Sequence, residues 1–332
     1  MIDGSMGEGA EAGTLREGKE ARLLADVRRG MAKPQKELSS KYFYDTRGSE
    51  LFEDITRLPE YYLTGTERAL LADQVAPWVA QSRPATLVEL GAGSARKTRV
   101  LLDAMRPGAA RTCYVPVDVA SDFIHATARE LRDEYEELDV RPVVQDISHP
   151  LEFVEGLERP VLFALLGSTI GNFDGDAAIA MLSNIRQAMD DGDCFLMGAD
   201  LRPGPGKSLE RLEAAYNDAT GVTAAFNLNI LRVINARLGT DYDPAAFEHR
   251  AGYNAEAGRI EMHLVSTGDQ VVQIPGGDAV EIRRGETIRT EISCKYDRAT
   301  VEALFASAGL SLRKWFQDPG DLYTLVMGGP RP

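Results

Sequence analysis

The feature that most constrains this chain is a stretch, from residue 86 to about residue 200, in which short apolar runs alternate with helix-like segments. Strands rich in Val, Leu and Phe that alternate with helices are typical of a parallel sheet covered on both faces. The stretch therefore predicts a βαβαβ order and an α/β fold. The apolar runs are TLVEL (86–90), TCYVPVD (112–118), PVVQD (142–146), PVLFALLG (160–167) and DCFLMGADL (193–201).

The flanking segments predict the rest of the domain organisation. Residues 1–14 are expected to be a disordered lead, and residues 15–85 a helical cover that includes a short helix capped by Ser49. Residues 203–290 start with helical spacing and become β-rich, which predicts an inserted α+β second lobe. Two late apolar runs, LRKWFQD and LYTLVMG, predict strands that return to the first sheet, so the core should comprise residues 86–202 and 291–332.

Composition narrows the class of partner. The formal net charge is −14, and an acidic surface repels nucleic acid and anionic membranes, so we expect a small-molecule partner. The three cysteines and four histidines lack CxxC and HxxxH spacing, so no metal site is expected. No apolar run approaches the ~20 residues of a membrane span, and the first residues do not resemble a signal peptide. We therefore expect a cytoplasmic monomer.

The glycine turn, LVELGAGSARKT (87–98), predicts a ligand site where a strand meets a helix. Glycines let the backbone approach a ligand, and the first N–H groups of the helix are free to bind it. A dinucleotide fold needs a third glycine, but Arg96 stands there. The shorter acidic-x-Gly-x-Gly pattern, with Glu89 before Gly91, suits S-adenosylmethionine (SAM). Glu89 would then contact the ligand's amino group or hold nearby backbone.

Acidic residues end the next two predicted strands. Asp118 is placed to accept two ribose hydroxyls, and Asp146 to lie beside an adenine. Either residue alone is equally explained as a helix cap. Because these acids and the glycine turn come at successive strand ends, where open α/β sheets bind ligands, their combination favours a Rossmann-like SAM-binding core.

Further polar residues suggest where a second substrate binds. Asn172 in LLGSTIGNF either faces a ligand or caps the following helix, and the residues do not decide between these interpretations. Glu291 and Ser293 in TEISCKY point to one face of a strand, where they can bind a ring with two N–H positions or form a solvated surface. Tyr44 and Tyr61 either line a pocket or belong to the core.

Five blocks of the sequence, in this order, look like the bacterial L-histidine Nα-methyltransferase family. They are KYFYDTRGSELFEDITRLPEYY, LVELGAGSARKTRVLLDAM, LLGSTIGNF, YNDATGVTAAFN and TEISCKY, and the resemblance extends from about residue 20 to about residue 328. Members of this family use SAM to trimethylate the α-amine of free L-histidine in three successive transfers. The product, hercynine, is formed in the first step of ergothioneine biosynthesis. The resemblance implies the same reaction here.

The resemblance also implies which residues bind the cofactor and the substrate. The residues that match the family's SAM contacts are Gly91, Lys97, Asp118, Asp146 and Ile147. Those that match its histidine contacts are Asn172 and Tyr216 at the carboxylate, Tyr61, Glu291 and Ser293 at the imidazole, and Met262 along the side chain. Tyr44 matches a tyrosine close to the substrate amine, where we expect either Tyr44 or a water to accept or relay the amine proton.

The sequence departs from the family pattern near one proposed contact. Leu63 and Gly65 stand in YYLTGTE where proline and arginine are expected. An N-methyltransferase for another aromatic amino acid, tryptophan or tyrosine, is therefore an alternative, because a fold does not determine a substrate. A nicotinamide-dependent oxidoreductase is a second alternative, which Arg96 disfavours.

Overall fold

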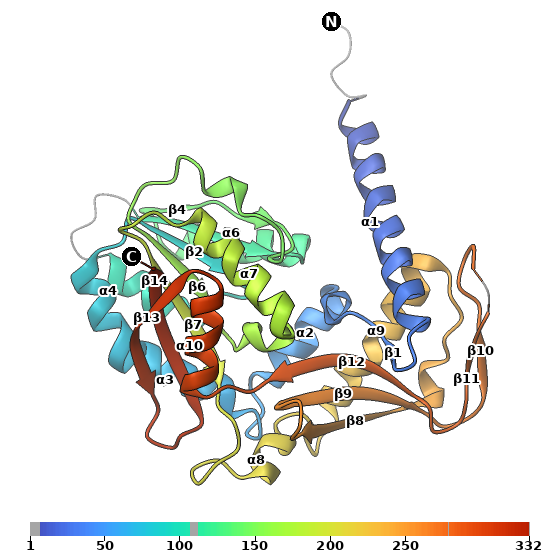
Figure 1. Cartoon of the computed structure of the whole chain (residues 1–332). Coiled ribbons are helices and arrows are strands. Elements are labelled where there is room, and N and C mark those ends of the chain that lie inside the picture. The colour runs from blue at the N-terminus through green and yellow to red at the C-terminus, as the bar shows by residue number, and fades with distance from the viewer. Residues whose placement is uncertain (1–6, 107–111, 278, 332) are drawn as a thin grey trace, which may run out of the picture.

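The computed structural model of the chain describes residues 7–106, 112–277 and 279–331. Its largest element is an eight-stranded sheet in the order β13-β14-β7-β6-β2-β3-β4, with β5 also paired to β3 (Figure 1). The strands from β7 to β4 are parallel, and β14 and β13 run antiparallel to their neighbours. The strands are β2 (Thr86–Leu90), β3 (Thr112–Asp118), β4 (Leu138–Val140), β5 (Val143–Val144), β6 (Val161–Leu165), β7 (Cys194–Asp200), β13 (Leu310–Gln317) and β14 (Tyr323–Pro330).

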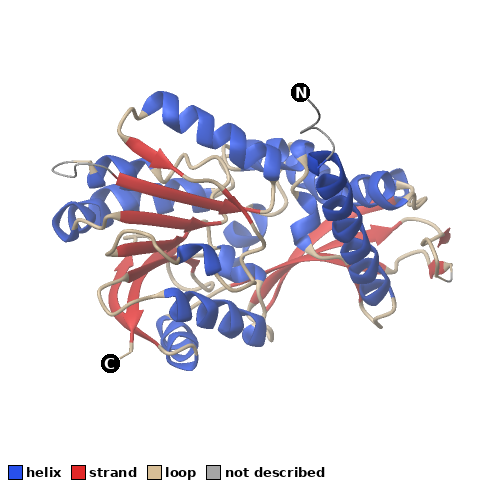
Figure 2. Cartoon of the chain, turned by 90° about the horizontal axis from the view of Figure 1, so that it is seen from above, coloured by secondary structure: helices blue, strands red, loops and turns tan. Residues whose placement is uncertain are grey.

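Helices cover both faces of this sheet (Figure 2), as expected for an α/β core. Neighbouring residues of β2 show why both faces are buried, because Leu87 belongs to one hydrophobic cluster and Val88 to the other. Successive side chains of a strand point to opposite faces, so a strand apolar on both faces needs a layer on each side. One layer contains α3 (Tyr62–Leu70), α4 (Ala76–Ser82), α5 (Arg99–Met105) and α6 (Ser121–Glu134), and the other α7 (Gly175–Ala188) and α10 (Arg298–Ser307).

A second, four-stranded sheet in the order β1-β12-β9-β8 lies beside the core (Figure 1). Alternate residues of β9, including Ile260, Met262 and Leu264, are buried, as expected for a sheet with one covered face. Helix α9 packs on that face through Phe226 and Ile230. The elements of this region are β1 (Lys36–Glu37), α8 (Leu209–Ala214), α9 (Val222–Leu238), β8 (Phe247–Asn254), β9 (Arg259–Ser266), β10 (Gln270–Val272), β11 (Val280–Ile282) and β12 (Thr287–Cys294).

Strand β12 crosses the boundary expected between residues 290 and 291. Its paired register continues to Cys294, so the second sheet extends four residues beyond that boundary. Two-residue strand β1, which belongs to the expected N-terminal cover, pairs in parallel with β12 at Ile288 and Arg289. We therefore propose that the second lobe ends after Cys294 and that the cover contributes a strand to its sheet.

The N-terminal segment differs from the sequence-based expectation in two places. Residues 1–6 of the expected disordered lead lie outside the described residues, and α1 (Gly7–Met31) begins within that lead. Helix α2 (Thr46–Ile55) is capped by Asp45, whose carboxylate accepts the Gly48 N–H at 2.7 Å, so the prediction of a cap at Ser49 is wrong. Asp45 is preferred because a residue accepts N–H groups from the turn that follows it, whereas Ser49 lies inside the helix.

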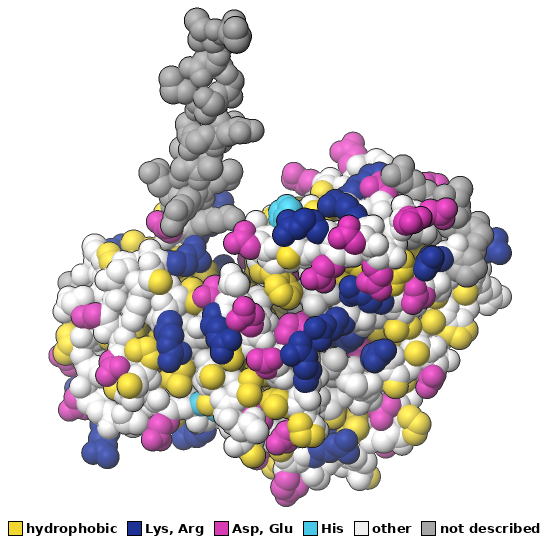
Figure 3. Space-filling model, turned by 180° about the vertical axis from the view of Figure 1, so that it is seen from behind, with side chains coloured by type: hydrophobic (Ala, Val, Ile, Leu, Met, Phe, Trp, Pro, Cys, Tyr) yellow, Lys and Arg dark blue, Asp and Glu magenta, His cyan; other side chains and the backbone are white. Residues whose placement is uncertain are grey.

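The described surface mixes charges of both signs. Figure 3 shows Lys and Arg side chains interspersed with Asp and Glu side chains over one face of the molecule. No helix in the described part of the chain is long and apolar enough to cross a membrane.

Candidate active site

The main cavity, of about 510 Å³, lies at the carboxyl ends of β2, β3 and β6. The glycine turn forms one wall, and Thr169, Asn172 and Phe173 after β6 form another. The N-terminal cover contributes Tyr44 and Tyr61. A ligand in this cavity is therefore enclosed by the core sheet on one side and by aromatic residues of the cover on the other.

The glycine turn has the backbone geometry that a close ligand requires. Gly91 and Gly93 adopt φ values of +73° and +52°, which residues other than glycine rarely adopt. The Gly93 N–H donates to one carboxylate oxygen of Asp118 at 3.0 Å, and the Ala120 N–H donates to the other at 3.0 Å. Burial raises the pKa of Asp118 although these backbone donors oppose the rise. The carboxylate is thus fixed at the end of β3, on the cavity wall.

Glu89 stabilises the glycine turn by accepting hydrogen bonds from side-chain hydroxyls rather than from backbone N–H groups. Its buried carboxylate accepts hydrogen bonds from the hydroxyls of Thr98, at 2.6 and 2.7 Å, and of Tyr114. Burial raises its pKa to about 7, and the two hydroxyl donors limit the rise. The strand before the turn is therefore anchored to the segment after it.

Lys97 lines the main cavity and forms an ion pair with Glu67 of helix α3. Glu67 is fully buried, and its two oxygens accept the Gly167 N–H at 2.8 and 3.0 Å. The hydroxyl of Tyr323 donates to the same carboxylate at 2.8 Å. The role of Glu67 could not be predicted from the sequence, because a single glutamate in an amphipathic helix is normally exposed and nothing local indicates its partners.

Asp146 and Ile147 line another part of the cavity. Asp146 lies two residues beyond β5, which is shorter than the strand expected over 142–146. Its carboxylate accepts the backbone N–H of Ser148 at 3.0 Å and its hydroxyl at 2.7 Å. Burial favours a higher pKa for Asp146, but these donors and the charge of Lys41 outweigh it and lower the pKa.

An aromatic cluster joins the N-terminal cover to the second lobe beside the cavity. The rings of Tyr44 and Phe226 lie 5.8 Å apart edge-to-face, and those of Tyr61 and Tyr216 lie 6.3 Å apart in the same arrangement. Neither the Tyr44 nor the Tyr61 hydroxyl makes a hydrogen bond to another described residue. Burial, with the negative charge of Glu291 as the next cause, raises the pKa of Tyr44 well above its usual value, so its hydroxyl stays protonated.

Asn172 does not cap the helix that follows it. Asp174 is the N-cap of α7, and its carboxylate accepts the Ala177 N–H at 3.3 Å. The Asn172 side chain lies on the wall of the main cavity and makes no hydrogen bond within the described part of the chain. Its amide is therefore available to a ligand.

Glu291, Ser293 and Met262 share one face of the second sheet. Glu291 pairs with Met262 across β12 and β9, and the register is regular from Glu291 to Cys294. Burial raises the pKa of Glu291 to about 7, and the charge of Lys295 limits the rise. No described residue donates a hydrogen bond to the Glu291 carboxylate.

Tyr216 and Ser293, which the family resemblance assigns to opposite ends of the substrate, are in direct contact. The Tyr216 hydroxyl lies 2.9 Å from Ser293 Oγ, and both oxygens lie 2.8 Å from Nζ of Lys295. The glycine at 171, next to Asn172, leaves little room in front of Ser293, since a Cβ there would lie 3.3 Å from Ser293 Oγ. The hydroxyl pair therefore lies close behind the cavity wall.

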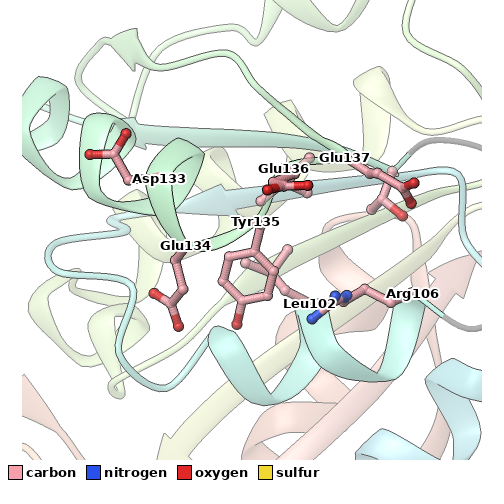
Figure 4. A pocket seen from close by; sticks show the side chains of 9 residues that line it. Leu102, Arg106, Asp133, Glu134, Tyr135, Glu136 and Glu137 are labelled. Atoms are coloured by element: carbon pink, nitrogen blue, oxygen red, sulfur yellow. The ribbon is translucent and has the colours of Figure 1, made fainter.

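A second cavity, of about 410 Å³, lies near the amino end of β3 and has a different character. Figure 4 shows acidic side chains around it, from Asp133 to Glu137, with Arg106 opposite. It lies away from the carboxyl edge, where open α/β sheets bind their ligands. No group of three or more His, Cys, Asp or Glu side chains in the described ranges is placed to hold a metal ion.

Comparison with known proteins identifies the family. The model of a family described as histidine-specific methyltransferase, SAM-dependent, matches residues 23–329. The chain is 43% identical to the histidine N-alpha-methyltransferase of Mycobacterium tuberculosis (strain CDC 1551 / Oshkosh), over 89% of this chain and 91% of that protein. It is 41% identical to the histidine N-alpha-methyltransferase of Mycolicibacterium smegmatis, over 92% and 94%.

A third relative is a longer protein. The chain is 30% identical to ergothioneine biosynthesis protein 1 of Neurospora crassa, over 83% of this chain but 31% of that protein. The two bacterial relatives match 89% and 92% of this chain, and the family model, over residues 23–329, includes the glycine turn and the second lobe. This chain therefore belongs to the family of SAM-dependent, histidine-specific methyltransferases.

Proposed function

We propose that this enzyme transfers three methyl groups in succession from SAM to the α-amine of free L-histidine, and so forms hercynine. Membership of the histidine-specific family and similarity to two histidine N-alpha-methyltransferases support this substrate. Similarity to ergothioneine biosynthesis protein 1 supports a place at the first step of ergothioneine biosynthesis.

The observation that carries the proposal is the half-buried carboxylate of Glu291, to which no described residue donates a hydrogen bond. A carboxylate that is partly withdrawn from water and has no protein donor favours a ligand that supplies one. Glu291 pairs with Met262 across the sheet, and Ser293, two residues further along the same face of β12, contacts the Tyr216 hydroxyl at 2.9 Å. An imidazole N–H is the donor that distinguishes histidine from phenylalanine or an aliphatic amino acid.

The residues of the main cavity fit SAM. Gly91 and Gly93 have the positive φ values that let backbone approach a ligand, and Asp118 presents a carboxylate to two ribose hydroxyls. Asp146 and Ile147 would hold the adenine, and Lys97 would attract the carboxylate of the methionine part. When bound, SAM supplies an electrophilic methyl group on a sulfonium.

The substrate would be held at both ends. Asn172 and Tyr216 would bind the carboxylate, while Tyr61, Glu291 and Ser293 would bind the imidazole and Met262 would pack along the side chain. Holding the amine in line with the methyl group accounts for most of the catalysis, because the reaction needs alignment and exclusion of water.

Tyr44 would act on the amine as a relay rather than as a free base. Its raised pKa keeps the hydroxyl protonated, so it can accept the amine proton only while it passes its own proton on. Its ring face can also attract the permanent positive charge that develops as methyl groups accumulate.

The test is mass spectrometry of L-histidine incubated with the enzyme and SAM. We expect products heavier by one, two and three methyl groups, with the trimethylated form accumulating. Equimolar tryptophan and tyrosine in the same mixture serve as competitors. Preferential methylation of either competitor, or the absence of any methylated histidine, would refute the proposed substrate.

A further inference from the structure

A buried cluster of one acid and two lysines joins the core to the second lobe. Asp200, the last residue of β7, forms ion pairs with Nζ of Lys207 at 2.6 Å and of Lys295 at 2.9 Å. All three side chains are fully buried. The Tyr62 hydroxyl also donates to Asp200, at 2.9 and 3.0 Å from its two oxygens. This acid–lysine cluster lies directly behind Tyr216 and Ser293.

Every proton of the Lys295 ammonium has an acceptor. Nζ lies 2.9 Å from Asp200 Oδ2, 2.8 Å from the Tyr216 hydroxyl oxygen and 2.8 Å from Ser293 Oγ. An ammonium group has three N–H donors and no acceptor, so each hydroxyl oxygen must accept from the lysine. The direction of these two hydrogen bonds is therefore fixed by chemistry.

The fixed direction determines what the hydroxyl pair offers to a ligand. Tyr216 and Ser293 have one hydroxyl proton each, and the 2.9 Å contact between them uses one of the two. The other proton is left to point away from Lys295. Whichever hydroxyl carries it, the pair presents one donor.

We propose that Lys295 is a positioning residue for the methyl acceptor, which orients the Tyr216–Ser293 pair so that it donates one hydrogen bond to an acceptor atom of the bound amino acid. This inference rests on the proposed function. The acceptor is a carboxylate oxygen or the unprotonated nitrogen of the imidazole.

The cluster also provides a matched control. Lys207 shares Asp200 with Lys295 and is equally buried, but its other hydrogen bonds go to the backbone oxygens of Leu201 and Leu322, at 2.6 and 3.3 Å, and its Nζ lies 4.9 Å from the centre of the Tyr62 ring. Replacing either lysine removes one buried cation from Asp200. Only replacement of Lys295 frees the hydroxyl pair.

The experiment compares Lys295→Met with Lys207→Met by calorimetry of the full-length chain. We expect Lys295→Met to bind L-histidine about tenfold more weakly, the effect of losing one oriented hydrogen bond, and S-adenosylhomocysteine (SAH) within about twofold of wild type. Lys207→Met should melt at a lower temperature but bind both ligands within about twofold of wild type. If Lys295→Met fails to fold, Lys295→Gln takes its place. Glutamine is polar and so better tolerated in this buried cluster, but its shorter neutral amide cannot reach all three acceptors.

Two results would overturn the inference. One is unchanged histidine affinity in the Lys295 variant, and the other is an equal loss of histidine and SAH affinity in both lysine variants, which would indicate a structural role alone. Histamine lacks the carboxylate, so it identifies the atom that accepts the hydrogen bond. If Lys295→Met weakens histamine binding less than histidine binding, the acceptor is the carboxylate. If it weakens both equally, the acceptor is the imidazole ring. If wild type does not bind histidine, the proposed function fails before Lys295 is tested.

Discussion

Replacing Glu67 by glutamine breaks the contact through which the N-terminal cover holds the cofactor side of the main cavity. The carboxylate pairs with Lys97, accepts the Gly167 N–H with both oxygens and accepts the Tyr323 hydroxyl at 2.8 Å. Glutamine keeps the shape but removes the charge and one acceptor oxygen. Gly167 and Tyr323 both donate to Oε1, so an amide oxygen there keeps both of them, whereas Lys97, which pairs with Oε2, loses its counterion and faces an NH2 group.

The size of the effect follows from burial. Removing one partner of a buried pair costs about 3–5 kcal/mol, and the lower limit applies because the Lys97 side chain is 20% exposed and can turn toward solvent in the cavity. For a chain of 332 residues the unfolding entropy is about 0.7 kcal/mol/K, so about 3 kcal/mol lowers the melting temperature by about 4 °C. Because Lys97 and Gly167 both line the cavity, SAH affinity should fall about tenfold.

The assay combines thermal melting with calorimetric titration of SAH. The matched control is Glu50→Gln on helix α2, where the glutamate is 57% exposed and, among the described residues, pairs only with neighbouring Arg47, so both quantities should stay at wild-type values. Gly198→Ala perturbs the same carboxylate independently, since a Cβ there would come within 2.1 Å of Glu67 Oε1. A Glu67→Gln enzyme that melts and binds SAH like wild type would show that the cover does not support the cofactor site.

Three further predictions concern the substrate side. Glu291→Ala should cost about 1–3 kcal/mol in histidine binding and narrow the preference over tryptophan, as measured by competitive turnover; retained histidine affinity would contradict the assignment. Tyr44→Phe should slow methyl transfer with little change in histidine affinity, and unchanged turnover at saturating histidine would exclude the relay. The pKa of Glu291 rises on folding from an ordinary 4.5 to about 7, so its contribution to stability is complete below about pH 4.5 and is lost as the pH rises through about 7. The ligand-free enzyme should therefore melt at a lower temperature at pH 8 than at pH 5.5. The difference should be smaller in Glu291→Gln, where Glu89, whose pKa is also raised, still contributes; an identical pH dependence in the two proteins would contradict the raised pKa of Glu291.

The core could be predicted from the sequence because its signals are local. The glycine turn, the apolar runs and Asp118 each depend on residues within one strand and the turn after it, and the return of β13 and β14 follows from two late apolar runs. The 142–146 run was less informative, since a valine pair bounded by polar residues supports a strand of only two residues.

The ionic contacts behind the site could not be predicted in the same way. Glu67 meets Gly167 across 100 residues and Tyr323 across 256, and no local pattern encodes such pairs. Lys207 and Lys295 are residue types that are nearly always exposed, so the sequence alone places them on the surface. Their burial follows from Asp200, and becomes visible only when the core and the second lobe are placed together.

The pairing of β1 with β12 has a practical consequence for anyone shortening this chain. A fragment that begins after Glu37 keeps the whole core and the second lobe, yet it leaves the outer side of β12 near Ile288 and Arg289 without its neighbour. Exposed N–H and C=O groups on a bare strand recruit strands from other molecules. Truncated material should therefore self-associate even though every residue of the proposed site remains present.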